Sequence, residues 1–383
     1  MKIQVAFSWH GYPVFMKDLS RLPVMRRLLS LLLCAAFVGG SAIAPAFAAT
    51  AVDPEAAEQL LTRGGLTAPE QLSLIRSVAQ AQFDRKDYLN AVLWFQRYIK
   101  SGGAEADARP ILANAYYGLR DYANAARELQ WEIQADDRIG RAPPEDRLLM
   151  LQSCYARLND ANAYAWALEK LVTHHPKRQY WADLLERTQR RPDFGARLSL
   201  EVSRLRLLTG TLGGAAEFVN MATQVRLSGY PAEAKQVMDQ GFAAGVLGTG
   251  VDAQRHRELM RQLAAEALAQ QRQASQPEVE VIANRASDGI ELFNLGWTLL
   301  TLGDQAKGLA MMEQGIRKGG LANKPHDAML RLGIGYMTAN QKLKALEAFK
   351  KVGGRHGAAD LARIWSMYAR NSDAVMPRQA QGS

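Results

Sequence analysis

The stretch DYLNAVLWFQRYI, residues 87–99, returns 34 residues later as DYANAARELQWEI, residues 121–133. Its apolar positions are spaced by three and four residues, which is the spacing of one face of an α-helix. Both copies open with an Asp-Tyr pair at the position of a turn between two helices. We therefore expect helical hairpins that repeat along the chain. The matching positions are Tyr88 with Tyr122, Ala91 with Ala125, Phe95 with Leu129, and Ile99 with Ile133.

A helical repeat of 34 residues is the period of the tetratricopeptide repeat, whose pattern is W-x2-L-G-x2-Y, then A-x3-F, then P. The fullest match is Met329-x2-Leu332-Gly333-x2-Tyr336 followed by Ala345-x3-Phe349, in which only the tryptophan position departs. Partial matches give six units, starting near residues 72, 106, 145, 215, 289 and 326. The chain thus resembles a tetratricopeptide-repeat protein, and this resemblance implies an all-α solenoid.

The 383 residues are 48% apolar and 22% charged, which indicates a globular chain and not a disordered one. Strand patterns are nearly absent. We expect a tetratricopeptide-repeat solenoid of helical hairpins with irregular intervening helices, in two halves, residues 53–212 and 213–370. The intervening helices are expected as a pair, Tyr180–Gln189 and Ala196–Thr209, and as a longer polar helix, Val251–Gln273.

Three further segments complete this organisation. Pro277–Ser287 has the weakest pattern and is expected to be a hinge. Ala359–Arg370 is expected to be a capping helix, because a solenoid needs its last apolar face covered. Residues 371–383 are expected to form a disordered tail.

Residues 25–48 have the pattern of a secretory signal peptide. Arg26 and Arg27 precede the apolar stretch Leu28–Ala44, and Ala46-Phe47-Ala48 predicts cleavage before Ala49. Residues 1–24 are then an over-extended start, with Met25 as the initiator. The alternative is an uncleaved anchor, because Leu28–Ala48 is just long enough to span a bilayer. A lipoprotein is disfavoured, since a lipobox wants a small residue where Leu33 precedes Cys34.

The formal net charge is +9, of which residues 1–48 contribute +4, so that +5 remains for the rest of the chain. This slight excess does not predict nucleic-acid binding. Cys34 is lost with the signal peptide, which leaves Cys154 as the single cysteine. Its neighbours are apolar, so we expect a buried, inert thiol and no internal disulfide.

No catalytic motif is present in the sequence. Residues 248–253, GTGVDA, imitate a dinucleotide-binding turn, but they follow a helix, so we interpret them as a helix stop with Asp252 as the next N-cap. His174 and His175 precede a proline and suit the end of a helix better than a metal site. We expect no cofactor, no metal and no enzymatic activity, with an enzyme of unrecognised site as an alternative.

Aromatic residues at signature positions belong to the core, whereas others lie on first helices away from the signature. In tetratricopeptide arrays the first helices line a concave groove, so these residues are candidates for peptide binding. Burial against a neighbouring hairpin is the alternative for each. A carboxylate clamp needs Lys and Asn four residues apart, which the chain matches only approximately. The aromatic candidates are Phe83, Tyr117, Phe293 and Trp297, and the polar candidates are Arg76, Gln80 and Asn114.

Several segments resemble a narrower family, the exported bacterial tetratricopeptide-repeat proteins often encoded beside TonB, ExbB and ExbD. The resemblance implies a non-catalytic periplasmic scaffold or adaptor whose partner is a protein or peptide, such as a TonB-system component. It implies neither a nucleic-acid partner nor an integral membrane protein after signal cleavage. A structural factor for assembly of the cell envelope is the alternative. The segments are 180–181, 204–212, 229–235, 241–250, 360–365 and 368–370.

The export hypothesis predicts the N-terminus of the protein recovered from a bacterial periplasm. Sequencing should start at Ala49 or within a few residues of it, because signal peptidase cleaves after the A-x-A pattern. An N-terminus at Met25 in a membrane fraction would instead establish the uncleaved anchor.

Overall fold

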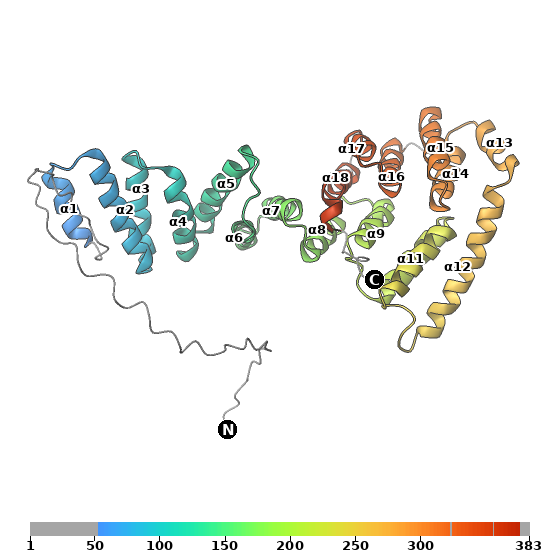
Figure 1. Cartoon of the computed structure of the whole chain (residues 1–383), viewed down its shortest axis with the longest axis horizontal. Helices are drawn as coiled ribbons and strands as arrows, with labels where there is room; N and C mark the ends of the chain where they lie inside the picture. The colour runs from blue at the N-terminus through green and yellow to red at the C-terminus, as the bar shows by residue number, and fades with distance from the viewer. Residues whose placement is uncertain (1–52, 322–323, 355, 376–383) are drawn as a thin grey trace, which may run out of the picture. The chain divides into compact units, whose positions relative to one another are not determined.

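The computed structural model describes residues 53–321, 324–354 and 356–375, and this part of the chain contains 18 α-helices and no strand (Figure 1). The fold class is therefore all-α, as the repeat pattern predicts. The expected start, residues 1–24, and the expected signal peptide, residues 25–48, lie outside the described residues. Among the helices that are described, none has the length and apolar character needed to cross a membrane.

Each of the six repeat units forms a hairpin of two helices that pack against each other. The first helices start within a few residues of the expected positions, so the six predicted units are confirmed. The hairpins are α2 (Ala68–Asp84) with α3 (Tyr88–Lys100), α4 (Glu105–Gly118) with α5 (Tyr122–Arg138), α6 (Glu145–Arg157) with α7 (Ala161–His174), α10 (Ala215–Leu227) with α11 (Pro231–Ala243), α14 (Ile290–Thr301) with α15 (Gln305–Lys318), and α16 (Pro325–Thr338) with α17 (Lys342–Lys350).

An aspartate closes the turn in four of these hairpins. Asp121, for example, is the N-cap of α5, and its side chain accepts a hydrogen bond from the Asn124 N–H at 3.1 Å. The residue before it, Arg120, has a φ of 61°. Its backbone therefore adopts the left-handed conformation that commonly ends a helix. The same N-cap bond recurs at Asp87, Asp160 and Asp304. This local chemistry fixes where each second helix begins.

The remaining helices lie between and beside the hairpins. They are α1 (Pro54–Arg63), α8 (Arg178–Arg190), the short 3-10 helix η1 (Ala196–Leu198), α9 (Ser199–Leu208), α12 (Ala253–Ala274), α13 (Pro277–Arg285) and α18 (Ala358–Val375). The intervening pair is present as α8 and α9, and the long polar helix is present as α12. Both predictions are confirmed.

Two expectations about irregular segments are wrong. The segment expected to be a hinge is the helix α13, whose Ala283 is buried against Leu292 and Leu295 of α14. The expected tail does not begin at residue 371, because α18 continues to Val375. The Asn371 side-chain amide donates to the Thr173 carbonyl oxygen at 2.9 Å, which fixes the end of α18 to α7. Residues 376–383 lie outside the described part.

The capping helix α18 contacts the middle of the chain as well as the last repeat. It packs on α16, α17 and α7, and Figure 1 shows the C-terminal helices beside α8 and α9. Arg191, which follows α8, forms an ion pair with Asp360 of α18 at 2.7 Å, across 169 residues of sequence. Trp181 of α8 and Tyr368 of α18 are buried, with their ring centroids 6.1 Å apart. The run of helices from α7 to α18 therefore returns on itself.

Glycines let the two helices of the α14–α15 hairpin touch through their backbones. A Cβ atom on Gly308 would lie 2.6 Å from both the Gly296 carbonyl oxygen and the Leu300 nitrogen. A Cβ atom on Gly296 would lie 2.6 Å from the Gly308 carbonyl oxygen. Since backbone atoms cannot move aside as a flexible side chain can, only glycine fits at these two crossing positions.

We expect Gly308→Ala to lower the free energy of unfolding by about 2 kcal/mol, because the added methyl group forces α14 and α15 apart. Gly335→Ala in α16 is the matched control. Its Cβ atom meets only side-chain atoms at 3.3 Å and beyond, and alanine favours a helix, so the change should stay below about 1 kcal/mol. Urea unfolding measures both variants. Equal effects would contradict the backbone-contact argument.

Candidate functional site

The N-terminal candidates lie at equivalent positions of neighbouring first helices. Phe83 of α2 and Tyr117 of α4 are both half-buried, 34 residues apart. Phe83 packs against Tyr88, and Tyr117 packs against Tyr122 with ring centroids 5.5 Å apart. The Tyr117 hydroxyl also shares a hydrogen bond of 2.9 Å with the Ser153 Oγ of α6. We call the residues Arg76, Gln80, Phe83, Asn114 and Tyr117 the first-helix surface.

The polar members of the first-helix surface differ in how far they are engaged. Arg76 forms an ion pair with Asp107 at 3.2 Å. Because the Arg76 side chain is exposed, a ligand could still contact its guanidinium group. Gln80 is half-buried and donates to Asp84. Asn114 Oδ1 accepts a hydrogen bond from Arg147 Nη1 at 2.8 Å, so its acceptor is already occupied.

Sequence reasoning missed Arg147, which organises the junction between α4 and α6. Its Nε and Nη2 atoms donate to the Glu132 carboxylate at 3.0 and 2.6 Å, and Nη2 also reaches the Pro110 carbonyl oxygen. Burial raises the pKa of Glu132, although the Arg147 hydrogen bond and charge act to lower it. The sequence offered one signal, an arginine near the start of α6, and such a residue is too common to indicate a structural role.

Phe293 and Trp297 are not accessible, so their prediction as groove anchors is corrected. Only 5% of Phe293 and 2% of Trp297 are exposed. Trp297 Nε1 donates to Glu233 Oε2 at 2.9 Å, and its ring packs against Tyr230 of the preceding α10–α11 hairpin. The returning α16 adds to this enclosure, because Arg331 lies over the same indole. Burial against a neighbouring hairpin was the alternative to ligand binding for every candidate, and it is correct for these two residues.

A buried ionic cluster surrounds Trp297. Arg204 of α9 donates through Nε and Nη2 to the Glu233 carboxylate at 2.6 and 2.8 Å, and through Nη1 to Glu201 at 3.1 Å. Its guanidinium carbon lies 4.6 Å from the Trp297 ring centroid. Arg331 of α16 adds a second ion pair to Glu201 at 2.8 Å. The cluster therefore joins α9, α11, α14 and α16.

The charges of this cluster favour a role in stabilising the fold over a role in proton transfer. Burial alone would raise the pKa of Glu233, but the Arg204 charge and its hydrogen bonds lower that pKa below the usual value. A carboxylate held ionised in this way is a weak base. Because the folded pKa is depressed, the pair stabilises the fold above the unfolded pKa of about 4.3, and this contribution is lost as pH falls through the folded value.

The other titratable groups singled out from the sequence occupy structural positions. Cys154 is fully buried, and burial raises the pKa of its thiol to about 11, so it stays protonated at neutral pH. His174 and His175 lie at the end of α7, as expected, and a ring nitrogen of His175 bonds the Pro143 carbonyl oxygen. In residues 53–375, apart from their short gaps, no group of three His, Cys, Asp or Glu side chains is placed to hold a metal ion.

The glycine-rich turn that imitates a nucleotide motif joins α11 to α12, two helices. Gly248 has a φ of 77°, and its N–H donates to His256 Nδ1 at 3.3 Å. Asp252 occupies the N-cap of α12, but its side chain makes no capping bond there. The turn is thus a helix stop followed by Asp252 at the N-cap, as the sequence predicts.

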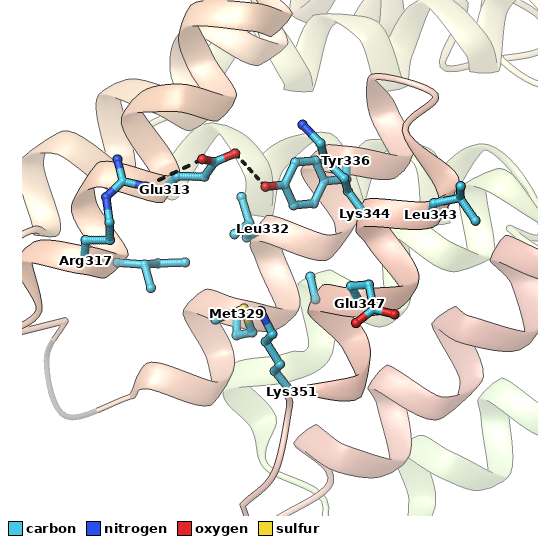
Figure 2. A pocket seen from close by; sticks show the side chains of 11 residues that line it. Glu313, Arg317, Met329, Leu332, Tyr336, Leu343, Lys344, Glu347 and Lys351 are labelled. Atoms are coloured by element: carbon cyan, nitrogen blue, oxygen red, sulfur yellow. Dashed lines mark hydrogen bonds and ion pairs between the residues drawn. The ribbon is translucent and has the colours of Figure 1, made fainter.

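The structure reveals a hollow that the sequence did not indicate, between the second helices α15 and α17 (Figure 2). Its volume is about 430 Å³. Tyr336 of α16 reaches into it and donates a hydrogen bond to Glu313 Oε1 at 2.6 Å. We call it the α15–α17 hollow. The lining residues are Glu313, Ile316, Arg317, Met329, Leu332, Tyr336, Leu343, Lys344, Glu347, Ala348 and Lys351.

No family model matches the chain, and no curated protein matches it. Among solved structures, the chain is similar to one described as the TPR2AB-domain:pHSP90-complex of yeast Sti1. The identity is 12%, and the match covers 80% of this chain and 97% of that chain with a TM-score of 0.25. A TM-score this low carries no argument about a site. The tetratricopeptide-repeat architecture instead follows from the six hairpins and their signature positions.

Glu233→Ala should lower the free energy of unfolding by about 3–5 kcal/mol, because it leaves Arg204 buried without its main counter-ion. Glu266→Ala is the control. The Glu266 ion pair with Arg226 is more than a third exposed on both sides, so its loss should cost below about 1 kcal/mol. Chemical unfolding at neutral pH distinguishes them. A cost for Glu233→Ala as small as that of the control would show that the cluster is not structural.

Proposed function

We propose that this protein is a non-catalytic scaffold that binds a segment of a partner protein on its N-terminal hairpins. The observation that carries the proposal is the first-helix surface, where an aromatic and an amide side chain recur at matching positions of α2 and α4. Aromatic residues and arginine dominate the binding energy of protein interfaces. The exposed Arg76 and the half-buried Phe83 and Tyr117 supply both kinds of contact.

The buried state of Phe293 and Trp297 supports the choice of the N-terminal hairpins. In the C-terminal half, the first helix α14 has its aromatic face filled by Arg204, Tyr230 and Glu233. A ligand could reach these rings only by displacing a buried ion pair, which is costly. On α2 and α4 the equivalent face keeps part of its aromatic surface in solvent.

We further propose that the scaffold acts in a bacterial periplasm, as an adaptor for a TonB-dependent energy-transduction system. The signal-peptide pattern of residues 25–48 supports export. The segments that resemble TonB-associated repeat proteins, such as residues 204–212 and 229–235, support the partner system. A stack of hairpins offers a long surface to such a partner, because each repeat adds one more first helix.

Pull-down from a periplasmic extract, followed by calorimetry with the recovered partner, tests this proposal. Phe83→Ala and Tyr117→Ala should each cost about 2 kcal/mol of binding free energy, while helicity stays unchanged. Leu93→Ala is the control, because Leu93 is 55% exposed on the second helix α3. Equal recovery by all variants would refute the first-helix surface. If the wild-type protein recovers envelope-assembly proteins and no TonB-system component, the adaptor role fails.

A further inference from the structure

The α15–α17 hollow combines apolar walls with an exposed leucine. Ile316, Met329 and Leu332 line it, and Leu343 stands beside it with 81% of its surface exposed. A single exposed leucine is unremarkable on a soluble protein, but an exposed leucine next to an apolar hollow extends one continuous apolar patch. A volume of about 430 Å³ accommodates a large apolar side chain, and it falls in the range of ligand pockets.

Two lysines lie at the α17 side of this apolar patch. Lys344 and Lys351 line the hollow from α17 and the residue after it, and within the described residues neither forms an ion pair with a carboxylate. Opposite them, Glu313 accepts the Tyr336 hydrogen bond and pairs with the exposed Arg317 at 3.6 Å (Figure 2). Glu347 is the other carboxylate of the lining.

Helix α17 carries two further lysines outside the hollow, of which Lys342 pairs with Asp373 at 2.6 Å. Over residues 342–351 there are four lysines and one glutamate. The chain after its first 48 residues carries a net charge of only +5. The charged residues that line the hollow are three cations and two carboxylates, so the lining carries a slight net positive charge, which favours an acidic partner over a basic one.

From this arrangement we propose that the α15–α17 hollow docks an acidic segment of a partner protein. One large apolar side chain of the segment enters the hollow, and flanking carboxylates meet Lys344 and Lys351. This site is separate from the first-helix surface, because it is formed mainly by second helices of the C-terminal hairpins.

Charge argues against the occupants that the chain itself could supply. Residues 1–48 have a net charge of +4, and residues 376–383 contain an arginine and no acidic side chain. A second copy that met this hollow face to face would bring the same lysines into contact. An acidic segment of another protein is the occupant that complements both the apolar walls and the basic surroundings.

The test uses fluorescence anisotropy with short labelled peptides in which a Leu, Phe or Met is flanked by Asp and Glu. Two control peptides replace the acids by Asn and Gln, or the apolar residue by Ala. The acidic apolar peptides should bind the full chain at least about tenfold more tightly than either control, and the affinity should fall as salt is raised. Equal binding of the amide peptides, or no binding by any peptide, would overturn the proposal.

Matched variants locate the binding. Leu343→Asp, and separately the pair Lys344→Glu and Lys351→Glu, should each weaken binding at least about tenfold. Leu227→Asp should leave it unchanged, because Leu227 is 82% exposed and lies outside the hollow. Circular dichroism should show the same helicity in all variants. Unaltered binding by Leu343→Asp overturns the site, and so does self-association of the wild-type chain that Leu343→Asp abolishes.

Phe83→Ala at the first-helix surface separates this inference from the proposed function. It should not change the affinity for the acidic peptides, even where it reduces recovery of the scaffold's partner. If Phe83→Ala weakens the peptides as much as Leu343→Asp does, the hollow is not an independent site.

Discussion

A helical hairpin can bury only part of its apolar surface by itself, so every hairpin of this chain needs a neighbour on each side. Between neighbouring hairpins, the apolar residues at the signature positions pack against each other and bury this surface. At the C-terminal end it is met by α18, whose Trp365 and Tyr368 are buried against Phe349 and Trp181. The covering helix therefore also connects the last repeat to the middle of the chain, and the return of α16–α18 onto α7–α9 follows from the same requirement.

This return determines what becomes of the C-terminal first helices. Once α9 and α16 enclose the face of α14, its polar neighbours lose water and must find partners within the protein. Arg204 meets this demand by binding two carboxylates and lying over Trp297. The cluster thus makes burial of the indole tolerable, and it converts a surface that could have held a ligand into core.

Local chemistry made the hairpins predictable. The 34-residue spacing and the aspartates at the turns act within one repeat, and residues such as Ala125 and Leu129 are buried as expected. Contacts distant in sequence were not predictable. The period of a helix identifies its apolar face, but it does not say whether a helix from another repeat covers it, and for this reason Phe293 and Trp297 were misplaced. Ala283 is buried against α14, and the local pattern of residues 277–287 does not say which helix will cover it.

Helices α1–α6 and the helices from α7 onward differ in how they are held in place. Helices α1–α6 pack on their neighbours along the chain, whereas α7–α9 and α16–α18 are joined by contacts as distant as Arg191 with Asp360. Stacks held by neighbours alone can open locally at the free end, while contacts distant in sequence couple many helices into one cooperative unit. The first-helix surface therefore lies on the part of the chain that can open more locally. The α15–α17 hollow lies beside the braced part, since its α16 and α17 walls pack on α18.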